Sequence, residues 1–331
     1  MYSVFVIENP LMDYIMHEEH GFLDAFGARP GTMQLVEHEV FMAILRASRG
    51  YEVVPGGSGA NTARGLALLI GAESPIDMPC YSGAIGSDPP GQEFRLLMNR
   101  MGIETSLAQK PAPTGVSAIV VTPDHERTMF TNLGACRDYA PDDVDLDLMA
   151  KSACFYTTGY LWDTEAQQQA LFTAVDEARR AGKPVYFDLA DPFVVDHHHA
   201  GLRAWLPGRV DTLFGNRQEL ERLTECSGSD NQILRAATRF APTVVMKIGR
   251  GGCLALSRGK LVHVKAESVV PVDTTGAGDS FAAAYLYGNL AGCGLKESLT
   301  LGNRMAARIV AVDGCRYDCV DRDDVLSALK P

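Results

Sequence analysis

The chain has no excess of positive charge and no long apolar run, and each absence excludes a class of protein. Among its 331 residues, 41 acidic side chains outnumber 30 basic ones, which gives a formal charge of −11. Nonspecific binding to nucleic acid or to anionic membranes requires clustered Lys and Arg, so neither partner is expected. No apolar run approaches the roughly 20 residues that a membrane-spanning helix needs. The first ten residues also lack the pattern of a signal peptide, and the sequence therefore predicts a cytoplasmic protein.

Cysteine is present, but not in the pairs that mark metal or redox sites. The eight cysteines lack the Cys-x-x-Cys spacing of such sites and are predicted to be reduced, mostly packed thiols. Internal repeats and low-complexity tracts are absent apart from His197-His198-His199. Consecutive side chains point in different directions and do not readily converge on one ion, so we interpret this triplet as a solvated loop rather than a metal site.

What is present is the composition of a globular protein with many turns. Apolar residues make up 46% and charged residues 21%, with 32 glycines, which suits one large α/β domain with an accessory piece. Strands are predicted at 4–7, 81–85, 153–158, 184–189, 212–214 and 243–248, and helices at 61–70, 92–101, 165–181, 202–206 and 218–225. This alternation indicates right-handed βαβ units and a mostly parallel sheet with ligands at the carboxyl ends of its strands.

Two segments depart from this alternation. The stretches 115–122 and 127–132 flank a turn at Pro123-Asp124 and are typical of a β-hairpin. The stretch 13–55 is less regular, with polar breaks and a Pro30-Gly31 turn, and we interpret it as an insertion rather than core.

The most informative motif is DTTGAGDS at 273–280, which directly precedes an Ala-rich apolar stretch. Gly276 and Gly278, around Ala277, allow a tight turn, and the helix that follows presents unpaired amides and a partial positive charge to an anion. Asp279 at this anion hole is placed to take a proton from an alcohol that attacks a bound phosphorus. The alternative is an ordinary loop in which Asp caps a buried helix.

A second glycine-rich turn, PGGSGAN at 55–61, opens a predicted helix. Gly56 and Gly57 let the backbone approach a ligand, and Asn61 offers a donor and an acceptor to vicinal hydroxyls. The segment is neither a Walker A motif nor a nucleophile elbow. It resembles a sugar-binding turn, and the alternative is a plain helix start.

Two further groups carry candidate ligands. Asp13 closely follows the first strand and Asn9, where its carboxylate would accept hydrogen bonds from a ribose 2′,3′-diol, unless it is an exposed loop residue. Asn216 and Glu219 lie three apart at a helix start and fit either the water shell of Mg²⁺ or a capping box, and the two roles are compatible.

These motifs, in this order and spacing, together with GAIGSDPPG at 83–91, resemble the ribokinase-like, or PfkB, family. Within it, the resemblance is nearest to the adenosine kinases, through NPLMD at 9–13, 127–135, ADPF at 190–193 and 211–219. It implies an α/β/α sandwich with a mostly parallel central sheet and a small β-rich lid. The large domain would comprise 1–12, 56–112 and 138–331, and the lid 13–55 and 113–137.

The resemblance also implies roles for residues that the motifs do not reach. Arg127 on the lid would neutralise phosphate charge, and Asn9 would join Asp13 at the ribose. Met33 stands where animal adenosine kinases have Gln, so the base is left open. The base pocket would consist of Leu35, Met129, Tyr160 and Trp162. ATP would contact Asn216, Lys247, Gly249, Gly251, Val264, Thr274, Asn303 and Ala307.

The function that the resemblance implies is ATP- and Mg²⁺-dependent phosphorylation of the 5′-hydroxyl of a purine nucleoside, with adenosine first. K⁺ activation is a further expectation, with carbonyls around Asp273 and Gly314 as ligands. A sugar kinase acting on ribose or fructose shares every catalytic residue and stays open, although the apolar lid insertion favours a base. A noncatalytic nucleoside sensor is disfavoured by the intact motifs. The sequence leaves monomer and homodimer open.

Overall fold

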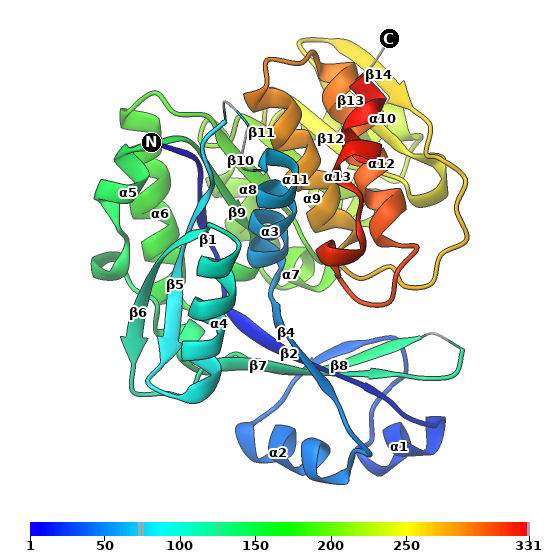
Figure 1. Cartoon of the computed structure of the whole chain (residues 1–331). Coiled ribbons are helices and arrows are strands. Elements are labelled where there is room, and N and C mark those ends of the chain that lie inside the picture. The colour runs from blue at the N-terminus through cyan, green and yellow to red at the C-terminus, as the bar shows by residue number, and fades with distance from the viewer. Residues whose placement is uncertain (72–73, 75, 125, 330–331) are drawn as a thin grey trace.

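A computed structural model of the chain describes residues 1–71, 74, 76–124 and 126–329. Its strands form two sheets, one of nine strands and one of five (Figure 1). Within the described residues, no helix is both long enough and apolar enough to cross a membrane. All eight cysteines are free and most are buried, as predicted.

The large sheet has the order β14-β13-β12-β11-β10-β9-β1-β5-β6, and every pairing from β12 to β6 is parallel. Only β13 and β14 add antiparallel pairings at one edge. The strands of this sheet are β1 (Tyr2–Ile7), β5 (Cys80–Gly86), β6 (Glu104–Lys110), β9 (Ser152–Thr158), β10 (Val185–Asp188), β11 (Thr212–Asn216), β12 (Thr243–Lys247), β13 (Cys253–Ser257) and β14 (Lys260–Val264).

Helices cover both faces of this sheet, because its strands are apolar on both sides. Along β1, Val4 and Val6 pack into one core with α3, α4, α11 and α12, whereas Phe5 and Ile7 pack into the other with α5, α6, α8, α9 and α10. The α/β/α sandwich is therefore confirmed. The helices are α1 (His20–Ala25), α2 (His38–Ala47), α3 (Ser58–Ile70), α4 (Pro89–Arg100), α5 (Leu146–Ala150), α6 (Glu165–Arg180), α7 (Pro192–His197), α8 (His199–Trp205), α9 (Arg217–Thr224), α10 (Asp230–Ala237), α11 (Ala277–Leu290), α12 (Leu295–Ile309) and α13 (Arg322–Leu326).

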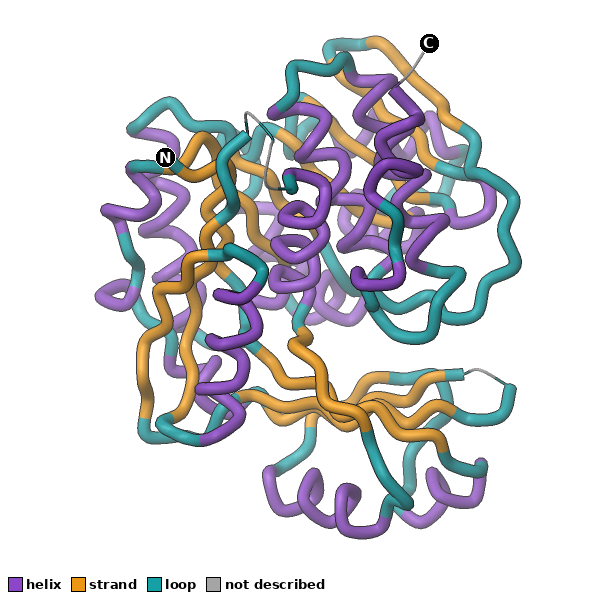
Figure 2. The backbone as a smooth tube through the Cα atoms, viewed as in Figure 1, coloured by secondary structure: helices purple, strands orange, loops and turns teal. Residues whose placement is uncertain are grey.

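The small sheet, which we call the lid sheet, has the order β3-β8-β7-β2-β4. One of its faces packs on α1 and α2, through contacts such as the ring pair of Tyr14 and Phe41 at 5.1 Å, and Figure 2 shows these helices on the side away from the large sheet. Its opposite face is therefore free to meet a ligand. The strands are β2 (Leu11–His17), β3 (Met33–Leu35), β4 (Glu52–Gly56), β7 (Gly115–Val121) and β8 (Arg127–Asn132).

One sequence interpretation is confirmed, one alternative is excluded, and one interpretation needs correction. The hairpin of β7 and β8 is present as predicted. The alternative in which Asp13 is an exposed loop residue is excluded, because β2 begins at Leu11 and places Asp13 inside the lid sheet. The interpretation of His197-His198-His199 as a loop is wrong. Helix α7 ends at His197, α8 begins at His199, and His198 caps both helices, with its backbone amide donating to the Val194 carbonyl.

Candidate active site

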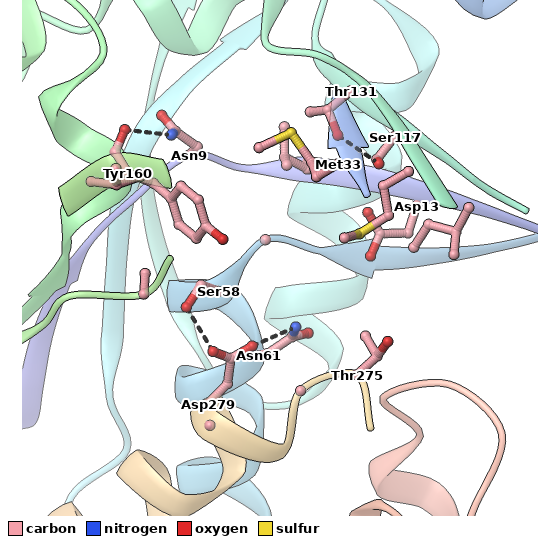
Figure 3. Close-up of a pocket in the computed structure, with 18 of the residues that line it drawn as sticks. Asn9, Asp13, Met33, Ser58, Asn61, Ser117, Thr131, Tyr160, Thr275 and Asp279 are labelled. Atoms are coloured by element: carbon pink, nitrogen blue, oxygen red, sulfur yellow. Dashed lines mark hydrogen bonds between the residues drawn. The ribbon is translucent and has the colours of Figure 1, made fainter. Parts of the chain in front are cut away.

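A cavity of about 620 Å³ lies between the lid sheet and the carboxyl ends of the strands of the large sheet. Parallel α/β sheets bind ligands at this edge, so the position agrees with the prediction. The lining combines the ends of β1, β9 and β10, the starts of α3 and α11, and the free face of the lid sheet. Figure 3 shows Tyr160 on one side, the lid residues on the other, and Asp279 beneath them.

Asp279 lies in the first turn of α11, and two donors hold its carboxylate (Figure 3). The Ser58 hydroxyl donates to Oδ1 at 2.7 Å, and the Asn61 amide donates to Oδ2 at 3.0 Å. Burial raises the pKa of Asp279, and these two hydrogen bonds oppose the rise. A raised pKa makes the carboxylate a better proton acceptor, while the donors fix its orientation.

The turn before α11 brings backbone amides to the same point. Gly276 has φ = 70°, a left-handed conformation, and a side chain there would start 2.3 Å from the Cys315 Sγ. Glycine is therefore required at this position. The Ala277 amide donates to the Thr274 carbonyl at 3.2 Å, so an anion would be held chiefly by the neighbouring amides of the helix start.

A cation lies beside this turn. The Lys247 Nζ, at the end of β12, donates to Asp188 Oδ2 at 2.7 Å, and a side chain at Gly278 would start 3.0 Å from Nζ. Burial lowers the Lys247 pKa, but the carboxylates of Asp188 and Glu219 outweigh it, and the net pKa is raised. Lys247 is therefore charged at neutral pH and adds positive potential next to Asp279.

Asn216 and Glu219 form the capping box that was one of their two predicted roles. The Asn216 Oδ1 accepts from the backbone amide of Glu219 at 2.9 Å, and Glu219 Oε2 accepts from the backbone amide of Asn216 at 2.8 Å. Burial raises the pKa of Glu219, and Lys247 opposes the rise. Within the described residues, no group of three or more His, Cys, Asp or Glu side chains is arranged to hold a metal ion by itself. A metal that also takes oxygen ligands from water and phosphate remains compatible with this pair.

Asp13 reaches into the cavity from β2, directly over Gly56, where any side chain would start 2.1 Å from the Asp13 carboxylate. Burial raises the pKa of Asp13 to about 7, against the charges of Arg64 and Arg127. Among the described residues, none donates a hydrogen bond to this carboxylate. An acceptor that faces a cavity in this way is suited to donors from a ligand.

Arg127, at the start of β8, ties the lid sheet to the loop before α11. Its guanidinium forms an ion pair with Asp273, and its Nη1 donates to Thr275 Oγ1 at 2.6 Å. Asp273 in turn accepts from the Gly314 amide at 2.6 Å. The positive charge of Arg127 thus stands next to the turn of Gly276, although Asp273 already compensates for much of it.

The remaining predicted residues fall into two groups. Those that line the cavity with Asp13 and Asp279 are Asn9, Met33, Leu35, Gly57, Asn61, Arg127, Met129, Tyr160, Lys247, Thr274, Gly276, Ala277 and Gly278. Those that lie outside it are Gly56, Asn216, Glu219, Gly249, Gly251, Val264, Asn303 and Ala307. Among the latter, Asn303 on α12 donates to the Val264 carbonyl at 2.9 Å.

Two residues differ from their expected surroundings. Trp162 is buried in the core and packs edge-on against Trp205 at 5.7 Å, so its assignment to the base pocket is wrong. Asn9 is already engaged at both ends of its amide, since it donates to the Tyr160 carbonyl at 3.3 Å and accepts from Gln167 at 2.7 Å.

Several residues that line the cavity were not among the predicted ones. Ser58 sits inside the predicted glycine-rich turn, so its hydroxyl was a detectable candidate. Glu8, directly before Asn9, is buried, accepts from the Asn9 amide at 2.8 Å, and has its pKa raised to about 7 by burial. Ser117 and Thr131 lie on adjacent lid strands, and only the pairing of β7 with β8 brings them together.

The comparison with known proteins identifies the family. A model of the pfkB family carbohydrate kinases matches residues 33–322. The chain belongs to this family. The predicted family and kinase activity are therefore confirmed, and the family implies ATP as phosphoryl donor and usually Mg²⁺.

Similar proteins include both nucleoside and sugar kinases. The structure of adenosine kinase from Sinorhizobium meliloti is 31% identical, with 95% of each chain covered and a TM-score of 0.87. Adenosine kinase from Schizophyllum commune is 25% identical over 92% of this chain and 94% of its own. A fructokinase from Klebsiella pneumoniae is 31% identical over 74% of this chain and 80% of its own.

Proposed function

We propose that this chain transfers the γ-phosphoryl group of ATP to the 5′-hydroxyl of a purine nucleoside, with adenosine as the first candidate. The observation that carries the proposal is the apolar cover of the cavity. Met33, Ile119 and Met129 form one row on the free face of the lid sheet, and Tyr160 lies across the cavity from it (Figure 3). A flat base fills such a slot, whereas a bare sugar would leave it empty.

The polar groups fit the rest of a nucleoside. The unpaired carboxylate of Asp13 is suited to a ribose 2′,3′-diol, and the Asp279 carboxylate lies deeper, at the helix start that would hold the phosphates. The similarity to adenosine kinases over nearly the whole chain supports the same assignment.

In the proposed reaction, Asp279 accepts the proton of the 5′-hydroxyl as the hydroxyl oxygen attacks the γ-phosphorus. The bond from that phosphorus to the oxygen of the β-phosphate breaks in line, and ADP leaves. The amides of Gly276 and Gly278, with Lys247 and Arg127, offset the negative charge on the phosphoryl oxygens. The two glycines belong to the turn that leads to Asp279, Lys247 lies beside Gly278, and Arg127 is held at Thr275 in the same loop.

We propose that the donor nucleotide extends from this site along Thr274 toward five of the predicted residues that lie outside the cavity. These are Gly249, Gly251, Val264, Asn303 and Ala307. Asn216 and Glu219 supply oxygen ligands suited to the water shell of Mg²⁺, whose charge would stabilise the phosphates. The carbonyls around Asp273 and Gly314 are the proposed K⁺ ligands.

We propose that the lid sheet closes on the nucleoside, and hydrogen exchange of the lid sheet tests the proposed function. Nucleoside alone is expected to slow hydrogen exchange at 33–36 and 128–133, because a bound base covers the free face of β3 and β8. The measurement is hydrogen–deuterium exchange with adenosine, ribose or fructose, with β13 as an internal reference. Protection by a sugar and none by any nucleoside would favour the sugar-kinase alternative, which the fructokinase relative keeps in view.

A further inference from the structure

The free face of the lid sheet is built of rows that run across its strands. Because side chains alternate along a strand, the residues paired across β2, β7 and β8 point to the same side. One row joins Asp13, Ser117 and Thr131, and the next joins Ile119, Met129 and Met33. The cavity therefore meets one polar row beside an apolar one, and all six side chains line it.

The polar row contains a pair of hydroxyls that bind each other. The Ser117 Oγ and Thr131 Oγ1 lie 2.9 Å apart, and either can be the donor (Figure 3). Both residues are buried, with 3% and 7% exposure. Each hydroxyl has one hydrogen and two lone pairs, so the pair always keeps one free O–H and free lone pairs for a third group.

The direction of this hydrogen bond decides what the pair offers. When Ser117 donates to Thr131, the free hydrogen is on Thr131 and Ser117 is an acceptor for the ligand. When Thr131 donates, the two roles are exchanged. Leu35, Ile119 and Met129 beside the pair are apolar, and the one charged neighbour is Asp13, next to Ser117 in the same row. Among the described residues, neither hydroxyl has a second hydrogen bond, so none fixes the direction.

Purine bases come with two matching edge patterns. A 6-amino purine presents a donor at the exocyclic nitrogen and an acceptor at N1, whereas a 6-oxo purine presents an acceptor at the exocyclic oxygen and a donor at N1. These two patterns are exchanged in the same way as the two states of the hydroxyl pair.

The hydroxyl pair lies where it could form hydrogen bonds with the edge of a bound base. Adjacent strands are about 5 Å apart, so Ser117 lies about 5 Å and Thr131 about 10 Å along the row from Asp13. With the ribose hydroxyls at Asp13, the base extends along this row, and its six-position points away from the ribose. Tyr160 and the apolar row flank it.

We propose that Ser117 and Thr131 determine base specificity, and that their reversible hydrogen bond lets the site accept both 6-amino and 6-oxo purine nucleosides. This inference rests on the proposed function, since it assumes a nucleoside in the cavity. It adds two residues and a substrate class to that function.

The test compares adenosine, inosine and purine riboside, which has hydrogen in place of the six-substituent. The wild-type protein is expected to show kcat/KM values for adenosine and inosine within about tenfold of each other, since the pair satisfies both edges. In the double variant Ser117→Ala, Thr131→Val, both values are expected to fall by about 10- to 100-fold, and by more than the value for purine riboside.

Three further variants separate base reading from packing. Thr131→Val alone keeps the shape of the side chain and replaces the double variant if that variant is unstable. It should also lower the ratio of kcat/KM for adenosine, and for inosine, to kcat/KM for purine riboside. Thr131→Ser keeps a hydroxyl and should restore wild-type ratios. Ile119→Val removes one methyl group from the neighbouring apolar row and should lower kcat/KM for all three nucleosides by the same factor.

The outcomes distinguish this inference from the function on which it rests. A wild-type preference of more than about a thousandfold for adenosine over inosine would overturn the inference and leave a nucleoside kinase, because it implies a fixed edge pattern. Unchanged ratios in Thr131→Val and in the double variant would do the same. No turnover of any nucleoside would overturn both.

Discussion

Asp279→Asn is expected to lower kcat by about three orders of magnitude or more, while ATP and nucleoside affinities stay close to the wild-type values. The amide keeps the shape of the side chain and can still meet Asn61 or Ser58, but it cannot take the proton of the 5′-hydroxyl. Steady-state kinetics and calorimetry of both substrates measure the two effects separately.

The pH dependence of the wild-type enzyme belongs to the same prediction. Burial raises the pKa of Asp279, so the base is protonated at a higher pH than an ordinary Asp, and kcat should fall as the pH falls through that raised value. Asp318→Asn, at an exposed surface ion pair with Arg316, is the matched control and should leave kcat unchanged. Turnover of Asp279→Asn within tenfold of wild type would show that another group is the base.

Asp13→Ala is expected to weaken nucleoside binding by roughly a hundredfold and to leave ATP binding unchanged, because two charge-assisted hydrogen bonds to the ribose are lost. The pKa of Asp13 is raised to about 7, so wild-type affinity should decrease as the pH falls below about 7, when the free carboxyl becomes neutral. The variant should lose this pH dependence. Calorimetry with adenosine and 2′-deoxyadenosine at several pH values measures the nucleoside affinity of both proteins.

The control for Asp13 lies on the same lid. Asp24→Ala changes an exposed carboxylate on α1, on the covered side of the lid sheet, and should leave nucleoside affinity unchanged. If the wild-type protein binds adenosine and 2′-deoxyadenosine equally well, Asp13 does not hold the ribose.

The chemistry at the helix start could be predicted from sequence because it is local. Gly276, Gly278 and Asp279 occur within four residues, and the backbone of a turn into a helix determines where their groups point. The alternation of strands and helices likewise predicted the large sheet, since each βαβ unit is encoded in a contiguous stretch. Neither inference needed to know which distant segments meet.

The lid could not be predicted in the same way, because its free face is assembled from strands far apart in the chain. Asp13, Ser117 and Thr131 form one row only through the parallel pairing of β2 with β7 and the antiparallel pairing of β7 with β8. Asp13 was predicted to lie just past the first strand, since Asn9-Pro10 indicates a turn, whereas β2 begins directly after that turn. A strand of seven residues with mixed polarity gave too weak an alternation to compete with that signal.

The central claim is that a purine nucleoside, rather than a sugar, receives the phosphoryl group. It is tested most directly by kcat/KM for adenosine, ribose and fructose with ATP and Mg²⁺, with the product identified by mass spectrometry and by the position of the phosphate in NMR spectra. We expect a nucleoside 5′-monophosphate and a preference for adenosine over either sugar of at least about a hundredfold, because only the nucleoside fills the apolar row of the lid. A preference for ribose or fructose would contradict the account.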